Sequence, residues 1–149
     1  MATIVCSADH WFEKLAGYQF DPAQLPAAHN ACLRKFINVC GSAQHSSQQV
    51  TILRGIPGSG KSTFIKAHPQ LAIVVDNTSP HATNVAPYWA VASAYGLSCK
   101  IITLRCDPVV AAARCQHGVP ADRIATMAVL MEEQEKLFPP WWTNEIVLS

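Results

Sequence analysis

Short apolar runs alternate along the chain with longer segments whose apolar residues recur at helical spacing. The apolar runs are residues 3–6, 50–54, 72–75 and 100–104, with a weaker fifth at 146–148. Runs of this length that are apolar at most positions are typical of strands covered on both faces. Strands that alternate with helices in this way predict an α/β fold, in which helices cover both faces of a parallel five-stranded sheet.

Helices are expected over residues 25–39, 61–69 and 85–95, from 107–108 onward and from about 120 onward. Apolar residues within 25–39 recur at close to helical spacing, and Gly41 is placed to cap the end of that helix. Gly96 is expected to end the third helix. Asp107 and Pro108 supply an N-cap and a proline at the first helical position of the fourth. The polar segment 42–49 has the composition of a linker.

The chain has 149 residues, half of them apolar, which predicts a single domain over residues 1–149. Because the formal net charge is only +1, a long nucleic acid held through many phosphates is not expected as a partner. Six cysteines without a CxxC pair indicate buried reduced thiols. The apolar start at residues 1–6 is too short for a signal peptide, and no apolar run approaches a membrane span. We therefore expect a cytoplasmic protein with no membrane partner.

Residues 55–62, directly after the second apolar run, read GIPGSGKS and match the phosphate-binding pattern GxxxxGK[ST]. In this pattern the glycines let backbone N–H groups turn toward phosphate oxygens, the lysine neutralises the outer phosphates, and the final hydroxyl ligates Mg²⁺. The sequence therefore predicts a site for ATP, or another nucleoside triphosphate, with Mg²⁺. Its expected nucleotide-binding residues are Gly55, Pro57, Gly58, Ser59, Gly60, Lys61, Ser62 and Thr63. The alternative is a glycine-rich turn that matches the pattern by chance.

Further motifs lie on both sides of this loop. They are SADHWF at residues 7–12, YQFDPAQLPAAHNAC at 18–32, VDNT at 75–78, PY at 87–88 and RCQHGVP at 114–120. Together they resemble a family of small phosphate-loop kinases related to the kinase domain of polynucleotide kinase, over nearly the whole chain. In that family the phosphate loop precedes the SADxxF motif, whereas here it follows it. The chain thus resembles a circularly permuted member, which implies the strand order 1-3-2-4-5 in chain numbering.

Two aspartates follow predicted strands, at the edge where open α/β sheets build their sites. The resemblance implies that Asp9 is the general base that accepts the proton of the acceptor hydroxyl, although Ser-Ala-Asp is also a natural helix N-cap. Ser62 and Asp76 are the expected ligands of Mg²⁺, and Asp76 could instead orient the acceptor. The alternative for Asp76 is a turn residue bonded to the backbone of residues 77–78.

Arg114 and Arg123 flank a predicted turn at residues 117–120. In kinases of this type the corresponding region is a lid, and its arginines neutralise charge on the transferred phosphoryl group. The resemblance therefore implies that both arginines are catalytic, together with Asp9 and Lys61. Each could instead be a solvated residue on a helix surface.

The acceptor side departs from the family pattern. Phe12 stands where the polynucleotide kinases often carry an arginine that holds the phosphate beside the acceptor hydroxyl, which puts recognition of a 3′-phosphorylated end in doubt. Leu130 and Cys115 are departures in the last helix and the lid, where the family has arginine and asparagine. Trp11 and Tyr18 could stack a base or a sugar, or could belong to the core.

The sequence therefore predicts a kinase that transfers the γ-phosphoryl group of ATP to a hydroxyl of a nucleic-acid end or nucleotide, in the manner of a polynucleotide 5′-hydroxyl kinase. One alternative changes the acceptor to a hydroxymethylated base in DNA or to a small metabolite. Another is a nucleotide-binding module that hydrolyses ATP slowly and acts through a partner. The second alternative needs no base at position 9.

Overall fold

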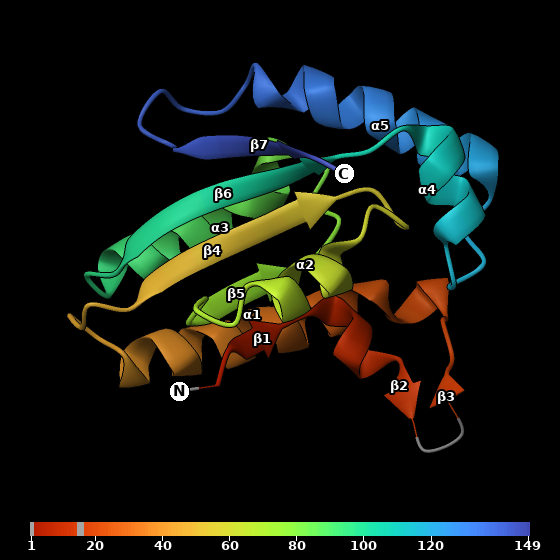
Figure 1. Ribbon diagram of the computed structural model, residues 1–149. Coiled ribbons are helices and arrows are strands. Elements are labelled where there is room, and N and C mark those ends of the chain that lie inside the picture. The colour runs from red at the N-terminus through yellow and green to blue at the C-terminus, as the bar shows by residue number, and fades with distance from the viewer. Residues whose placement is uncertain (1, 15–16) are drawn as a thin grey trace.

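A parallel five-stranded sheet forms the centre of the computed structural model, which describes residues 2–14 and 17–149 (Figure 1). Its strands lie in the order β1-β5-β4-β6-β7, and every neighbouring pair is parallel. The strands are β1 (Ile4–Cys6), β4 (Gln49–Gly55), β5 (Ile73–Asp76), β6 (Ser98–Arg105) and β7 (Asn144–Leu148). The predicted α/β class is confirmed, and counting these strands along the chain gives the predicted order 1-3-2-4-5.

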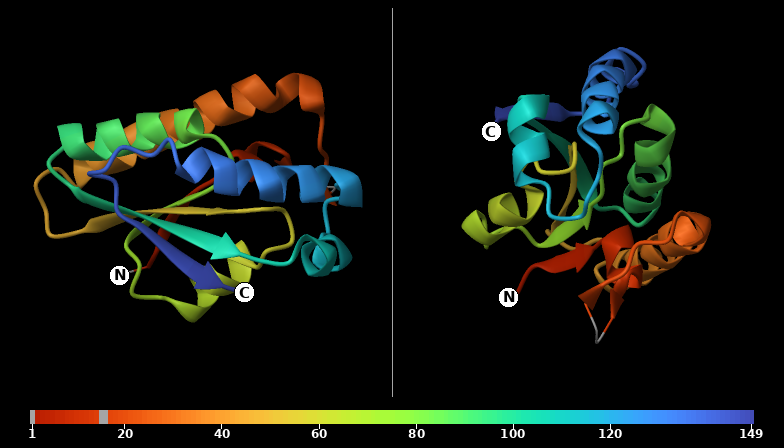
Figure 2. Two further views of the ribbon diagram at one scale, coloured as in Figure 1. Left: turned by 90° about the horizontal axis from the view of Figure 1, so that it is seen from above. Right: turned by 90° about the vertical axis from the view of Figure 1, so that its right-hand side faces the viewer.

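Helices cover both faces of this sheet, as expected (Figure 2). They are α1 (Leu25–Ser42), α2 (Lys61–Ala67), α3 (Ala82–Ala94), α4 (Pro108–Arg114) and α5 (Ala121–Glu135). The first, third and fifth lie on one face and α2 on the other, while α4 packs against α5 at the end of the sheet. Between β1 and α1 stand two short 3₁₀ helices, η1 (Ala8–Trp11) and η2 (Pro22–Gln24), and a hairpin of β2 (Glu13–Lys14) and β3 (Gly17–Tyr18).

The boundaries of some elements differ from the expectation. Gly41 does not cap α1, because the helix continues through it to Ser42 and the N–H of Ala43 closes the last turn. The connection to β4 is therefore shorter than the predicted linker and covers residues 43–48. Helix α3 begins a turn before the expected start, where His81 and Asn84 form a reciprocal capping box. Gly96 does end this helix, with φ of +71°.

The core lies on both sides of β4. Ile52 and Leu53, which are adjacent in β4, are fully buried and belong to different hydrophobic clusters. Ile52 packs with Phe36 of α1 and Tyr88 of α3, whereas the cluster of Leu53 includes Phe64 of α2. Because successive strand residues point to opposite faces, the burial of both residues shows that β4 is covered on both sides.

All six cysteines are free thiols, and four of them are buried: Cys6, Cys32, Cys40 and Cys106. Burial raises the pKa of Cys6 and of Cys40 to about 11, so both thiols are protonated at neutral pH. In the part of the chain that the structure describes, no helix has the length and apolar character needed to cross a membrane.

Parallel pairing brings the ends of three strands to one edge of the sheet. Leu53 of β4 lies opposite Asp76 of β5, and Cys6 of β1 lies opposite Val75. The segments that follow these strands therefore emerge side by side. The segments after β1 and β4 carry Asp9 and Lys61, and Asp76 is the last residue of β5. These are residues that the sequence singles out for chemistry.

Candidate functional site

The loop between β4 and α2 supplies the first part of the site. Gly55 ends β4, residues 56–60 form the loop, and Lys61, Ser62 and Thr63 open α2. Gly58 and Gly60 have φ of +82° and +94°, in the left-handed region that favours glycine. A Cβ on Gly58 would also collide with the backbone carbonyl of Ala111, because α4 packs directly against the loop. Glycine is thus required at this position by conformation and by space.

Lys61 turns back over this loop. Its Nζ donates a hydrogen bond of 2.9 Å to the carbonyl oxygen of Gly55. Burial lowers the pKa of Lys61, and the negative charges of Asp76 and then Asp9 oppose that shift. These effects place both carboxylates in the electrostatic surroundings of the ammonium group, although no ion pair joins them within the described residues.

Asp76, at the end of β5, is the least satisfied carboxylate of the site. Its Oδ1 is buried with no hydrogen-bond partner among the described residues, and the same is true of Ser59 Oγ in the loop. Burial raises the pKa of Asp76, while the charge of Lys61 opposes the rise. Since Oδ1 bonds no backbone N–H of residues 77–78, this oxygen does not act as the turn acceptor that the sequence left open for Asp76.

The oxygens at this edge fit a hard cation such as Mg²⁺. Asp76 offers a buried oxygen without a partner, and Ser62 offers an exposed hydroxyl at the start of α2. Among the described residues, no group of three or more His, Cys, Asp or Glu side chains could hold a metal ion. A cation bound here would therefore need further oxygens from water or from phosphate groups.

Asp9 lies on the exposed side of the same edge. It belongs to the first turn of η1, and the N-cap of that helix is Ser7, whose hydroxyl accepts from the N–H of Asp9. The Asp9 side chain is therefore not the N-cap. Its Oδ1 accepts a hydrogen bond of 3.1 Å from the hydroxyl of Tyr18 on β3.

The residue after Asp76 fixes η1 against β5. Asn77 is buried, and its Oδ1 accepts a hydrogen bond of 2.9 Å from the N–H of Ala8. Its Nδ2 points to the thiol of Cys32 on α1, at 3.6 Å. Asn77 thus holds the turn that carries Asp9 beside the strand that carries Asp76, a role that the sequence analysis did not assign.

The two predicted lid arginines are exposed. Arg114 ends α4 and Arg123 lies in the first turn of α5. Neither side chain makes a hydrogen bond or ion pair with another described residue, so the structure does not bring them onto Lys61 or Asp9. The segment between them does reach the site: the ring of His117 stacks on Tyr18, with ring centroids 4.0 Å apart and planes at 6°.

Aromatic residues on the acceptor side divide between the core and the surface. Phe12 is buried and packs with Tyr18 and Phe20. Trp11 and Phe20 remain 42% and 48% exposed. The indole N–H of Trp11 donates to Gln24 Oε1 at 2.7 Å, which holds one of these exposed rings in place.

Sequence reasoning missed Arg54, the last residue before Gly55 in β4. Its side chain is fully buried, and its guanidinium lies 5.1 Å from the ring centroid of Phe138. Burial lowers its pKa to about 10, so the group stays charged at neutral pH. Its donors bond the carbonyl oxygens of Ser79, Pro80 and Met131 and the hydroxyl of Thr103.

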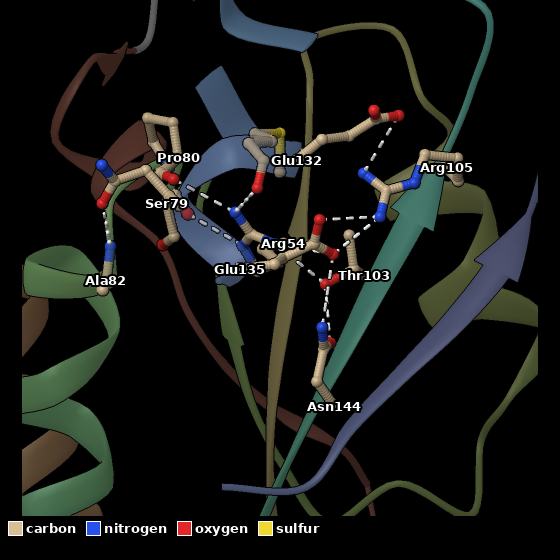
Figure 3. Close-up of polar contacts among 11 residues, drawn as sticks. Arg54, Ser79, Pro80, Ala82, Thr103, Arg105, Glu132, Glu135 and Asn144 are labelled. Atoms are coloured by element: carbon tan, nitrogen blue, oxygen red, sulfur yellow. Dashed lines mark hydrogen bonds and ion pairs between the residues drawn. The ribbon is translucent and has the colours of Figure 1, made fainter. Parts of the chain in front are cut away.

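Glu135 at the end of α5 balances this buried charge. Its Oε1 lies 3.5 Å from Arg54 Nη1, and both of its oxygens accept from Arg105 Nη2, at 2.7 and 2.8 Å (Figure 3). Asn144 of β7 donates to the same carboxylate. A charged residue within an apolar run is the sequence signal that could have revealed this network, because a buried charge requires partners.

A hollow of about 680 Å³ lies away from this site, at the start of β1 and the end of α1. It is lined by Ile4, Lys35, Asn38, Val39, Ser42, Ala43 and Gln48. The ammonium of Lys35 donates to the carbonyl oxygen of Val5. Its lining residues include no buried charge and no unpaired buried oxygen. The hollow therefore lacks the groups that suit phosphate and Mg²⁺ at the sheet edge of Lys61 and Asp76.

Comparison with known proteins adds no family to this description, since neither a protein-family model nor a curated protein matches the chain. Fold and geometry define an α/β protein with a glycine-containing loop, a partly buried lysine and two aspartates at the carboxyl edge of its sheet.

Proposed function

We propose that this protein is an ATP- and Mg²⁺-dependent kinase that phosphorylates a hydroxyl of a nucleic-acid end or nucleotide. The observation that carries the proposal is the convergence of Lys61, Asp76 and Asp9 at one sheet edge. Phosphoryl transfer needs a cation for the phosphates, oxygens for Mg²⁺ and a base for the acceptor, in one place. The motif resemblance and the strand order support a circularly permuted phosphate-loop kinase.

In the proposed reaction the acceptor hydroxyl oxygen attacks the γ-phosphorus and forms a new P–O bond. The bond from that phosphorus to the bridging β–γ oxygen breaks, and ADP leaves with the electron pair. Asp9 takes the proton of the hydroxyl, and Lys61 balances charge on the phosphates. Ser62 and Asp76 would hold Mg²⁺ together with phosphate oxygens, and the bound ion would supply positive charge near the transferred group. Arg114 and Arg123 are proposed to approach it when the segment between them closes.

Exposed aromatic rings support a base or sugar as part of the acceptor. Trp11 lies two residues after Asp9, and its exposed ring offers a stacking surface beside the proposed base. The buried ring of Phe12 brings no cation for a 3′-phosphate, which supports keeping a hydroxymethylated base in DNA or a small metabolite as alternative acceptors. The other alternative is a nucleotide-binding module with slow ATPase activity.

The proposal is tested by transfer of radiolabelled phosphate from ATP to 5′-hydroxyl DNA, 5′-hydroxyl RNA, modified-base DNA and nucleosides. We expect Lys61→Ala and Ser62→Ala to abolish transfer while the proteins stay folded. Asp9→Asn should keep ATP binding. It should lower the rate of phosphoryl transfer by a factor on the order of a hundred to ten thousand, because the amide keeps the shape of the carboxylate without its basicity. Label released as inorganic phosphate alone, unaffected by Asp9→Asn, would favour the nucleotide-binding alternative.

A further inference from the structure

Tyr18 connects two parts of the site that are far apart in the chain. Its hydroxyl donates to Asp9 Oδ1 at 3.1 Å, and its ring stacks on His117. Asp9 belongs to η1, whereas His117 belongs to the segment between α4 and α5. The two contacts use different parts of the side chain, so each can be removed without the other.

The hydrogen bond from Tyr18 to Asp9 has the direction that suits Asp9 as a general base. Burial raises the pKa of Tyr18, and the charge of Asp9 raises it further, so the phenol keeps its proton at neutral pH. The phenol therefore donates to the carboxylate. One oxygen of Asp9 is oriented in this way, which leaves the other as the proton acceptor.

The ring stack connects Tyr18 to the segment of residues 115–120. The planes of the Tyr18 and His117 rings are nearly parallel, at 6°, and the 4.0 Å separation of their centroids places one ring over the other. Gly118, the next residue, has φ of +72°, which turns the chain directly after His117. The stack therefore links Tyr18 to a segment that is flanked by Arg114 on α4 and Arg123 on α5.

We propose that Tyr18 is a positioning residue that couples the orientation of Asp9 to the position of the 115–120 segment. This inference rests on the proposed function and deepens it. When the segment closes over a donor nucleotide, the stacked ring and its hydroxyl bring the base into alignment in the same movement. Transfer then requires both contacts, whereas ATP binding requires neither.

Two substitutions separate these contacts. Tyr18→Phe removes the hydroxyl and keeps the ring, and we expect it to lower kcat about tenfold or more, with the Kd for ATP unchanged. His117→Ala removes the stack and should also lower kcat. His117→Phe should restore kcat, because it can stack, whereas His117→Gln should not. Tyr95→Phe is the matched control, since Tyr95 lies beside Gly41 of α1 and should leave kcat unchanged.

The decisive measurement repeats Tyr18→Phe in the Asp9→Asn protein. If the hydroxyl acts through the carboxylate, the second substitution produces no further loss of kcat. An equal loss in both backgrounds, or a Tyr18→Phe protein as active as the wild type, overturns the inference and leaves the proposed function standing. A wild-type protein that transfers phosphate to no acceptor overturns the proposed function, and the inference with it. Thermal melting of each variant identifies losses that arise from unfolding.

Discussion

Asp76 is partly buried, and its Oδ1 is buried without a hydrogen-bond partner in the part of the chain that the structure describes. A carboxylate in such surroundings is destabilising when ionised, because burial removes water and the nearby charge of Lys61 does not fully offset that cost. The fold keeps this oxygen where the proposed metal would use it. Binding sites commonly reduce stability in this way, because the groups that receive a ligand are unsatisfied without it.

We expect Asp76→Asn to raise the melting temperature of the ligand-free protein at neutral pH. The folded-state pKa of Asp76 lies above its ordinary value of 3.8, so its contribution to stability is fully present below that pH and is lost as pH rises through the folded-state pKa. The gain from the amide should therefore be largest near neutral pH and shrink as pH falls toward 3.8. Thermal melts across this pH range measure it.

Glu145→Gln is the control for this experiment, since Glu145 is exposed on β7. It should leave the melting temperature nearly unchanged at each pH. A stabilisation by Asp76→Asn that does not depend on pH would contradict the electrostatic explanation. The same variant should bind the Mg²⁺ complex of ATP more weakly than the wild type does.

At the scale of elements, two glycines that were both expected to end a helix differ in whether alanine could replace them. Gly41 lies inside α1 without a positive φ, and a Cβ there would meet the ring of Tyr95 at an ordinary 3.8 Å. We expect Gly41→Ala to stabilise the protein by up to about 1 kcal/mol, because alanine loses less backbone freedom on folding. Urea unfolding measures the change.

Gly96→Ala is the matched comparison. Its φ of +71° is unfavourable for alanine, and a Cβ would collide with the ring of His45. The expected effect is a destabilisation of at least about 1 kcal/mol. If Gly41→Ala destabilised the protein as much as Gly96→Ala, the end of α1 would differ from the one described.

Most elements of the fold were predictable because their signals are local. Apolar runs located the five sheet strands, and Asp107 with Pro108 located the start of α4. The β2–β3 hairpin was missed, since strands of two residues carry no readable alternation. Gly41 was misassigned because the residue type fits a cap and a helix interior equally well until φ is known.

The placement of three of the candidate site residues was predictable for the same reason. Asp9, Lys61 and Asp76 each follow a strand, so parallel pairing was enough to bring their segments to one edge. The hydrogen bond of Tyr18 to Asp9 and its stack on His117 were not predictable, because periodicity says nothing about which distant side chains meet. The Arg54 network was missed for the same reason.

At the scale of the whole molecule, the Arg54–Glu135 network joins the centre of the sheet to its last helix and strand. The Arg54 side chain is fully buried and that of Glu135 is 14% exposed. We expect Glu135→Ala to destabilise the protein by about 3–5 kcal/mol, because it leaves a buried guanidinium without its countercharge. Urea unfolding of the ligand-free protein measures this loss.

Glu132, one turn earlier on α5, provides the control. Its side chain is 65% exposed and lies 3.8 Å from Arg105. Glu132→Ala should change stability by no more than about 0.5 kcal/mol, as is usual for a solvated ion pair. Similar effects for the two glutamates would mean that the other contacts of Arg54 stabilise it without the countercharge of Glu135.

The pairing of β1 with β5 has a consequence for how the protein is made. Ile4 lies opposite Ile73, so β1 leaves the ribosome without a sheet partner until β5 has followed it. By then α1, β4 and α2 have been synthesised, and β4 can pair with β5 while β1 is still unpaired. Such distant contacts slow folding and leave an apolar edge open to other chains. The three-residue length of β1 limits that hazard during translation.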